Sequence, residues 1–155
     1  MGESLEVKRL VLDTSVLIEY IVKKAPYKLK VGKLLEKAAE GKIELFITSI
    51  TLSEVMYVAS KIYEVALLPS PNREALDFIL WLKGRVKIIE ANEDIAIKAG
   101  ELKKILHIAL PDCYVIAAAE VMNAIPVFKK VEREMKLVLN KLRNLKVKFL
   151  NEILI

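Results

Sequence analysis

Two aspartates stand where an apolar segment meets the start of a helix, and carboxylates in such places can bind a divalent metal ion. Asp13 follows the apolar run 10–12 and precedes two hydroxyl residues and a new apolar stretch. Asp112 opens a helix that is apolar on nearly all sides. Burying a carboxylate on such a helix is costly unless a partner or a metal stabilises it.

Each aspartate also has a simpler interpretation. Asp13 can be a strand-end acid that only caps the next helix, and its position alone does not separate the two readings, although ligands of open α/β sheets bind at that edge. Asp112 can be a first-turn acid that complements the helix dipole, worth about 0.3–1 kcal/mol. We favour a site at Asp112, because its surroundings are apolar.

Other candidate side chains carry weaker signals. Glu54 lies about 130° from the centre of the apolar stripe of its own helix, so periodicity places it on the surface. Only its closeness to the second strand brings it near the same edge. Glu132 and Glu134 stand among lysines and arginines, which is typical of a charged helix start. His107, the only histidine, is expected on the surface and not as a catalytic base.

Strands alternate with helices along the chain. We expect strands at about 8–12, 43–47, 86–89, 126–128 and 147–150, with helices ending near 24, 40, 63, 83 and 105, one opening at 110 and a basic one over 131–143. Thr14 or Ser15, then Thr48 or Ser49, and then Asn92 are the expected helix caps. This alternation predicts an α/β protein with a mainly parallel sheet of four to five strands.

Composition restricts the class of protein. A chain of 155 residues suggests one domain, spanning 1–155. A single cysteine, Cys113, and a single histidine exclude an internal disulfide, multi-histidine zinc sites and cysteine-cluster sites. The chain has no apolar run of about 18 residues and no signal-peptide pattern, so we expect a soluble, cytoplasmic protein without a membrane segment. Abundant Lys, Glu and Ile without glutamine suggest a thermophile.

Positive charge is concentrated near the carboxyl end. From Lys129 to Ile155 there are eight Lys or Arg and three Glu, a net charge of +5 that equals that of the whole chain. Such asymmetry can mark a face for an anionic partner, such as a phosphate backbone. A solvated surface helix of a thermophilic protein explains it equally well.

Four stretches carry a family resemblance that covers nearly the whole chain. They are LVLDTSVL at 10–17, ITSITLSEV at 47–55, AIKAGELK at 96–103 and LPDCYVIAAA at 110–119. In order and spacing, the first, second and fourth stretches resemble the three acidic motifs of the PIN-domain ribonucleases, and in particular of the VapC-type toxins of toxin–antitoxin pairs. The stretch at 96–103 is similar to the helix that commonly precedes the third motif. The resemblance implies an α/β/α sandwich around a central parallel sheet, with acidic residues around Mg²⁺ or Mn²⁺.

The resemblance also implies roles for the matching residues. Asp13 and Asp112 would be the metal ligands, and Glu54 would complete the acidic pocket. One departure stands after the fourth strand, where the family often has Thr-x-Asp and this chain has FKKVE at 128–132. Glu132 is then the candidate for the fourth carboxylate, with Glu134 as the second choice.

The function that follows is a metal-dependent endoribonuclease, which the resemblance makes the toxin of a VapBC-type pair. It implies 5′-phosphate and 3′-hydroxyl products, a small antitoxin partner and a homodimer. Lysines near Lys129 and Lys130 are expected to hold the RNA backbone. The alternatives are an rRNA-processing PIN nuclease and a non-catalytic PIN-like module that binds RNA or protein. A receiver domain ranks lower, because it needs an aspartate after the third strand, where Glu90 stands.

Overall fold

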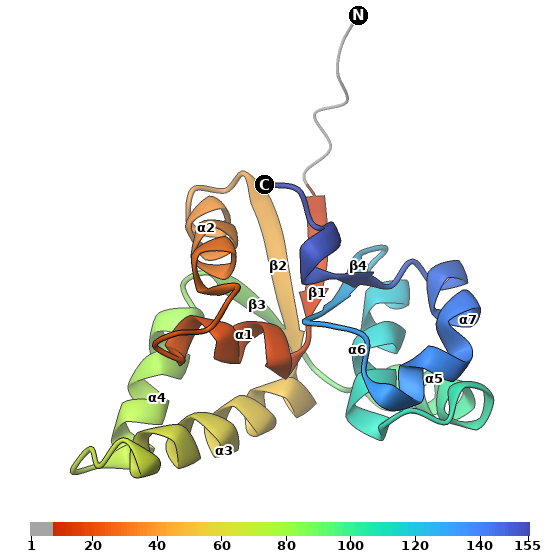
Figure 1. Ribbon diagram of the computed structural model, residues 1–155. Coiled ribbons are helices and arrows are strands. Elements are labelled where there is room, and N and C mark those ends of the chain that lie inside the picture. Colours follow the sequence, from red (N-terminus) through yellow and green to blue (C-terminus); the bar gives the residue numbers. More distant parts are fainter. Residues whose placement is uncertain (1–7) are drawn as a thin grey trace, which may run out of the picture.

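A five-stranded parallel sheet forms the centre of the structure, a computed structural model that describes residues 8–155 (Figure 1). The strands are β1 (Lys8–Leu12), β2 (Ile43–Thr48), β3 (Val86–Ile89), β4 (Ile125–Phe128) and β5 (Lys148–Phe149). They are ordered β3-β2-β1-β4-β5, so the chain builds outward from β1 on one side and later on the other. The strand order therefore reverses between β1 and β4, and ligands of such sheets bind at the carboxyl edge of that point.

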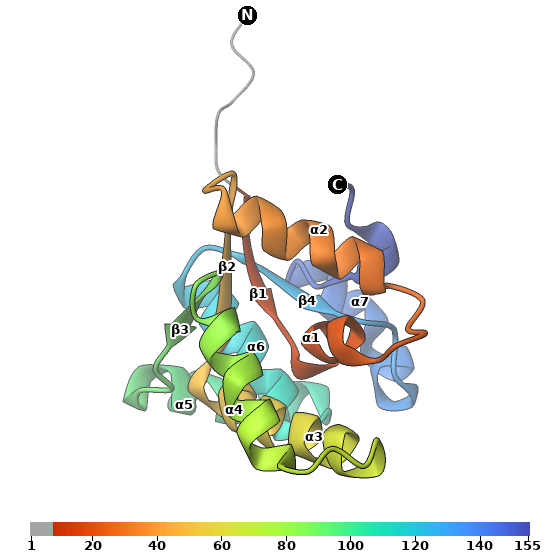
Figure 2. The same cartoon turned by 90° about the vertical axis from the view of Figure 1, so that its left-hand side faces the viewer.

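Helices cover both faces of the sheet (Figures 1 and 2). They are α1 (Thr14–Ile21), α2 (Lys28–Ala39), α3 (Ser49–Val65), α4 (Pro71–Leu82), α5 (Glu93–Leu106), α6 (Leu110–Val121) and α7 (Leu139–Asn144), with 3-10 turns η1 (Arg133–Val138) and η2 (Leu150–Glu152). Residues of α1 to α4 share one core, and residues of α5, α6, η1 and α7 share the other. The predicted parallel sheet and α/β/α sandwich are confirmed.

The central strand shows how the two cores are divided. Leu10 and Leu12 belong to the core beneath α1 to α4, and Val11 belongs to the core on the opposite face. Successive side chains of a strand point to opposite faces of the sheet, so these three residues are divided between the two cores. All three are fully buried, because helices cover both faces. A strand covered on both sides reads as a continuous apolar run, which is the pattern that predicted it.

Helix caps follow the prediction at two of three places. Thr48 caps α3 and Asn92 caps α5, each accepting a hydrogen bond from a first-turn amide. The prediction that Thr14 or Ser15 caps α1 is wrong, because β1 leads into the helix without an intervening loop. Asp13 is the cap, and its Oδ2 accepts from the Ser15 amide at 3.1 Å. The candidate metal ligand therefore also begins the helix.

Three predicted helix boundaries need correction. The first helix ends at Ile21 and not near residue 24. The fourth helix, which the sequence predicts from Glu74, begins at Pro71, because proline fits the first turn, where its missing amide hydrogen is not needed. The basic helix expected over 131–143 is instead η1 followed by α7. Within these two short elements only Met135 and Leu142 are buried, so the segment lacks the continuous apolar stripe that keeps one long helix in place.

Within residues 8–155, every helix is too short or too polar to span a bilayer.

The Asn92 cap gives a direct test of the fold. We expect Asn92→Ala to lower the free energy of unfolding by about 1 kcal/mol, because the Ile95 amide loses the acceptor that now lies at 3.0 Å. Asn92→Asp keeps an acceptor and should lose much less. Urea unfolding at constant slope measures both variants. Equal losses in the two variants would show that the side-chain cap contributes nothing.

Candidate metal-binding active site

Five carboxylates from four segments of the chain gather at the carboxyl edge of the sheet. Asp13 follows β1, Glu54 lies in the second turn of α3, and Asp112 lies in the first turn of α6. Glu132 and Glu134 follow β4. This edge lies at the lower centre of Figure 1, where α1 and α3 begin below the ends of β1 and β2. The fold therefore brings together all the acids that the sequence suggested.

Asp13 is the most buried acid of the group. Its residue is 8% exposed, and Oδ2 accepts hydrogen bonds from the Ser15 amide at 3.1 Å and the Ser15 hydroxyl at 2.6 Å. Burial raises the pKa of the Asp13 carboxyl, and the two bonds from Ser15 oppose that rise. The negative charge of Glu132 raises it further. Ser15 thus holds the Asp13 carboxylate in a fixed orientation, close enough to Glu132 for the two negative charges to repel each other.

Glu54 is half-buried and does not point freely into water. Its Oε1 accepts a hydrogen bond from the Thr14 hydroxyl at 2.7 Å. Burial raises the pKa of Glu54, and the charge of Asp13 adds to the rise. The periodicity of α3 alone placed this residue on the surface, and that prediction is wrong because the outer side of α3 faces the start of α1 here.

The pKa of Asp112 is affected by all four other acids of the cluster. Burial is the main cause that raises its pKa to about 7, and the charges of Asp13, Glu54, Glu134 and Glu132 follow in that order. The first turn of α6 supplies a favourable dipole, yet the repulsion remains. A carboxyl that titrates near neutrality among other acids is typical of a site built for a cation or a proton.

The donor set suits a hard divalent cation. Carboxylate oxygens prevail, and the nearest thiol, Cys113, is buried with its pKa raised to about 11, so it stays protonated at neutral pH. His107 is exposed at the end of α5, as predicted, and the charges that raise the pKa of Asp112 all come from acidic side chains. Among residues 8–155 no three acidic, histidine or cysteine side chains stand close enough to enclose an ion. Mg²⁺ fits such an open set, since it binds through one or two carboxylates and keeps several waters.

A family model for the PIN domain matches residues 10–138. This chain belongs to the PIN domain family. The match includes every acid of the cluster, so the resemblance that the four motifs indicated is confirmed. No curated protein matches the sequence of this PIN domain.

Solved structures share the fold. A chain of VapBC2 from Rickettsia felis, solved with a DNA fragment from their promoter, is 24% identical, with a TM-score of 0.63 over 91% of this chain and 98% of that one. VapBC-1 from nontypeable Haemophilus influenzae is 18% identical, with a TM-score of 0.61 over 93% and 99%. VapC20 from Mycobacterium tuberculosis, described as a sarcin-ricin loop cleaving toxin, is 12% identical, with a TM-score of 0.56 over 74% and 84%.

Three residues beside the acids were not found as a group from the sequence. The Lys129 amide donates to the Ser15 hydroxyl at 3.2 Å, and the Lys129 ammonium lies 3.3 Å from Oε2 of Glu19. Lys129 had been expected to hold RNA, yet its charge is paired with a buried acid. One signal was present, because Glu19 is the only charged residue of α1.

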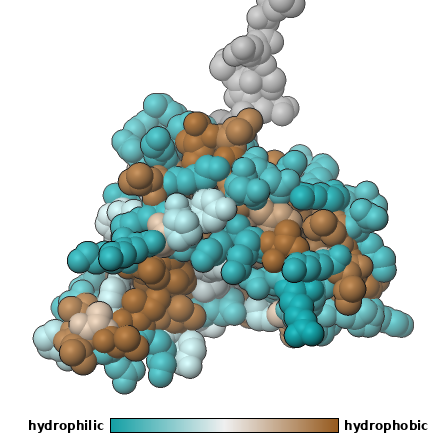
Figure 3. Space-filling view, in the orientation of Figure 1, coloured by the Kyte–Doolittle hydropathy of each residue, from teal (hydrophilic) through white to brown (hydrophobic). Residues whose placement is uncertain are grey.

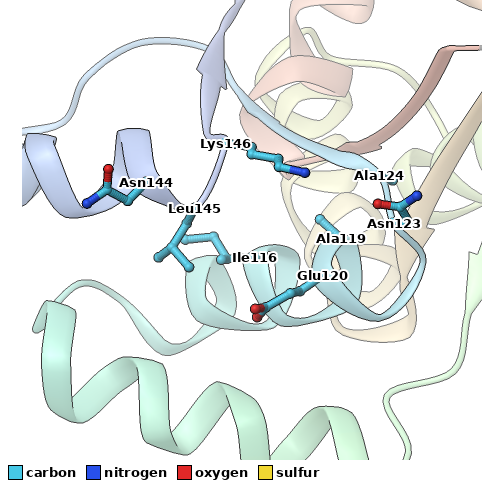
Figure 4. A pocket seen from close by; sticks show the side chains of 8 residues that line it. All are labelled: Ile116, Ala119, Glu120, Asn123, Ala124, Asn144, Leu145 and Lys146. Atoms are coloured by element: carbon cyan, nitrogen blue, oxygen red, sulfur yellow. The ribbon is translucent and has the colours of Figure 1, made fainter.

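A separate cavity of about 160 Å³ lies at the far end of α6 (Figure 4). Its lining includes Ala119, Glu120 and Asn123 from α6 and its end, and Leu145 and Lys146 from the loop before β5. Figure 4 shows these side chains bordering the last turns of α6, whereas Asp112 lies in the first turn. The cavity therefore contains none of the clustered acids of this PIN domain.

The raised pKa of Asp112 makes stability depend on pH. Because the folded chain binds this proton more tightly than the unfolded chain, its contribution to stability is complete below pH 3.8 and is lost as the pH rises through about 7. We expect Asp112→Asn in metal-free buffer to be more stable than wild type at about pH 8, by on the order of 1–2 kcal/mol after allowance for solvent screening. At about pH 5 the difference should be clearly smaller, because the folded carboxyl is then protonated and only the carboxyl of the unfolded chain is ionised.

Urea unfolding at the two pH values measures this difference. Asp94→Asn, a change of an exposed acid on α5, is the matched control and should show no such dependence. A pH-independent difference for Asp112→Asn would contradict the electrostatic account of the cluster.

Proposed function

We propose that this chain is a metal-dependent endoribonuclease, formed by a single PIN domain over residues 1–155, and the toxin of a VapBC-type pair. The observation that carries the proposal is the meeting of Asp13, Glu54 and Asp112 with a glutamate after β4 at the point where strand order reverses. The raised pKa of Asp112, to about 7, supports it because burial and the negative charges of four neighbouring acids both disfavour the ionised carboxylate unless a cation is bound. The fold similarity to VapC20, described as a cleaving toxin, adds support.

Asp13 and Asp112 would hold Mg²⁺ or Mn²⁺, with Glu54 and Glu132 completing the acidic pocket. The chemistry that the bound ion supplies is activation of a water and neutralisation of the charge that develops on the scissile phosphate. Ser15 fixes the orientation of Asp13, and Thr14 does the same for Glu54. A cation held by Asp112 would favour its ionised form, which burial and the neighbouring acids disfavour in the metal-free protein. Products with 5′-phosphate and 3′-hydroxyl ends follow from the family resemblance.

The proposed partners are RNA, a small antitoxin and a second copy of the chain. Lys130 and Arg133 are exposed beside the clustered acids and are suited to an RNA backbone. The VapBC neighbours support an antitoxin. Apolar side chains gather at the lower left of Figure 3, over the outer end of the α3–α4 hairpin, where Val65 is 81% and Leu67 is 88% exposed. A partner would remove such surface from water.

We propose that the protein is located in the cytoplasm of a thermophile. Its single cysteine cannot form an internal disulfide, and its sequence is rich in Lys and Glu. An rRNA-processing PIN nuclease has the same chemistry, and a short antitoxin-like reading frame upstream would distinguish the toxin from it.

A non-catalytic binding module is the second candidate, favoured by the open spacing of the acids within residues 8–155. It predicts RNA binding that persists undiminished in chelator, with no cleavage under any divalent metal.

The nuclease proposal is tested at its two principal ligands. We expect Asp13→Asn and Asp112→Asn each to reduce Mn²⁺-stimulated RNA cleavage by at least about 100-fold, because each removes a charge that the reaction uses. Calorimetric titration should show Mn²⁺ binding lost in parallel. The exposed-site variant Asp94→Asn should cleave and bind as wild type does. Full cleavage in both ligand variants would refute the assignment.

The fourth acid is tested separately. The charge of Glu132 raises the pKa of both Asp13 and Asp112, whereas the charge of Glu134 raises the pKa of Asp112, where its effect is larger than that of Glu132. Only Glu132 thus links the segment after β4 to both proposed metal ligands. We therefore expect Glu132→Gln to lower cleavage about tenfold or more, and Glu134→Gln to lower it less. Initial rates at saturating Mn²⁺ compare the two matched substitutions. The reverse order would transfer the role to Glu134.

A further inference from the structure

We propose that Lys129 and Glu19 are positioning residues for Asp13, so that Lys129 belongs to the support of the acidic site and not to the surface that holds RNA. The inference rests on the proposed nuclease function, and it assigns a role to a pair that the acid cluster does not include. Lys129 is the first residue after β4, and Glu19 lies one turn beyond Ser15 on α1.

The main chain of Lys129 reaches Asp13 through Ser15. The Lys129 amide can only donate, so the Ser15 hydroxyl must accept there, at 3.2 Å. The single proton of that hydroxyl is then left for Oδ2 of Asp13, at 2.6 Å. The position of the Lys129 backbone therefore determines how Ser15 presents its proton, and hence how the Asp13 carboxylate is oriented.

The side chain of Lys129 forms a second link to α1, through an ion pair with Glu19. Its Nζ lies 3.3 Å from Oε2 of Glu19, which is 3% exposed, and Oε1 of Glu19 accepts from the Tyr27 amide at 3.3 Å. Ser15 and Glu19 are four residues apart and lie on one face of α1. One residue after β4 thus binds two successive turns of the helix that Asp13 begins.

Every polar group of Lys129 is engaged within the protein. Besides the amide and the ammonium, its carbonyl accepts from the Leu150 amide at 3.3 Å. A phosphate that drew the ammonium away would leave the buried charge of Glu19 without its cation, which is strongly unfavourable. The adjacent Lys130 is exposed and forms no ion pair within residues 8–155, so it is free to meet an RNA backbone.

The two neighbouring lysines provide a matched experiment, Lys129→Gln against Lys130→Gln. Calorimetry measures the Mn²⁺ dissociation constant, and fluorescence anisotropy in EDTA measures binding of a mixed-sequence single-stranded RNA. We expect Lys129→Gln to weaken Mn²⁺ binding about 10- to 100-fold, with RNA affinity within about twofold of wild type. Lys130→Gln should leave Mn²⁺ binding unchanged, weaken RNA binding and reduce the slope of log affinity against log salt by about 0.7.

Two further variants separate positioning from simple loss of folding. Lys129→Arg keeps a cation that can reach Glu19 and should restore Mn²⁺ affinity to near the wild-type value. The double variant Glu19→Gln/Lys129→Gln removes both buried charges, so it should fold even where the single variant does not. Because the two residues act as a unit, its Mn²⁺ affinity should be no lower than that of Lys129→Gln.

Each contrary result identifies what is wrong. Weakened RNA binding with unchanged Mn²⁺ affinity in Lys129→Gln would make Lys129 an RNA ligand and overturn the inference. Unchanged values for both ligands would make the pair inert and overturn it equally. A wild-type chain that binds no Mn²⁺ would overturn the proposed nuclease function, and the positioning role with it.

Discussion

The removal from water of carboxylates that also repel one another is the constraint on which this structure depends. Burial raises the pKa of Asp13, Glu54 and Asp112, and in each case a neighbouring carboxylate raises it further. The protein offsets part of this cost with dipoles and hydroxyl protons, since Asp13 caps α1, Asp112 lies in the first turn of α6 and Thr14 donates to Glu54. The part of the cost that is not offset is relieved when a cation or a proton enters the site, so the site favours binding of either one.

The sheet topology explains why the acids meet. β1 lies at the centre, with β2 and β4 on either side, so residues that follow these three strands converge although they are far apart in sequence. α6 packs against β1 and begins at the same edge, and it brings Asp112 close to Asp13, which follows β1. Because the two faces of the sheet carry separate cores, the helices on each face can hold the acids of the site from opposite sides.

Local signals in the sequence predicted the scaffold well and the site in part. Apolar runs identified all five strands, and Asp112 was favoured because its helix is apolar on nearly every side. Glu54 could not be found from periodicity, because that method assumes that water covers the polar side of a helix, and here α1 covers it. The link from Glu19 to Lys129 joins residues that only the fold brings together, so no local pattern could reveal the pairing.

The charge pattern of the carboxyl-terminal segment acquires a different meaning in the folded protein. From Lys129 onward the sequence suggested one basic face, but the cations there have different partners. Lys129 is paired with Glu19, and Arg143 is paired with Glu152 at 2.7 Å and lies over the Phe149 ring. Those two charges are paired within the protein, so fewer cations remain to attract an anion than the net charge implies. Binding of an RNA backbone near the acids would therefore rely on a few exposed cations such as Lys130. Because the salt dependence of binding scales with the number of phosphate contacts, the affinity for RNA should fall only moderately as salt rises.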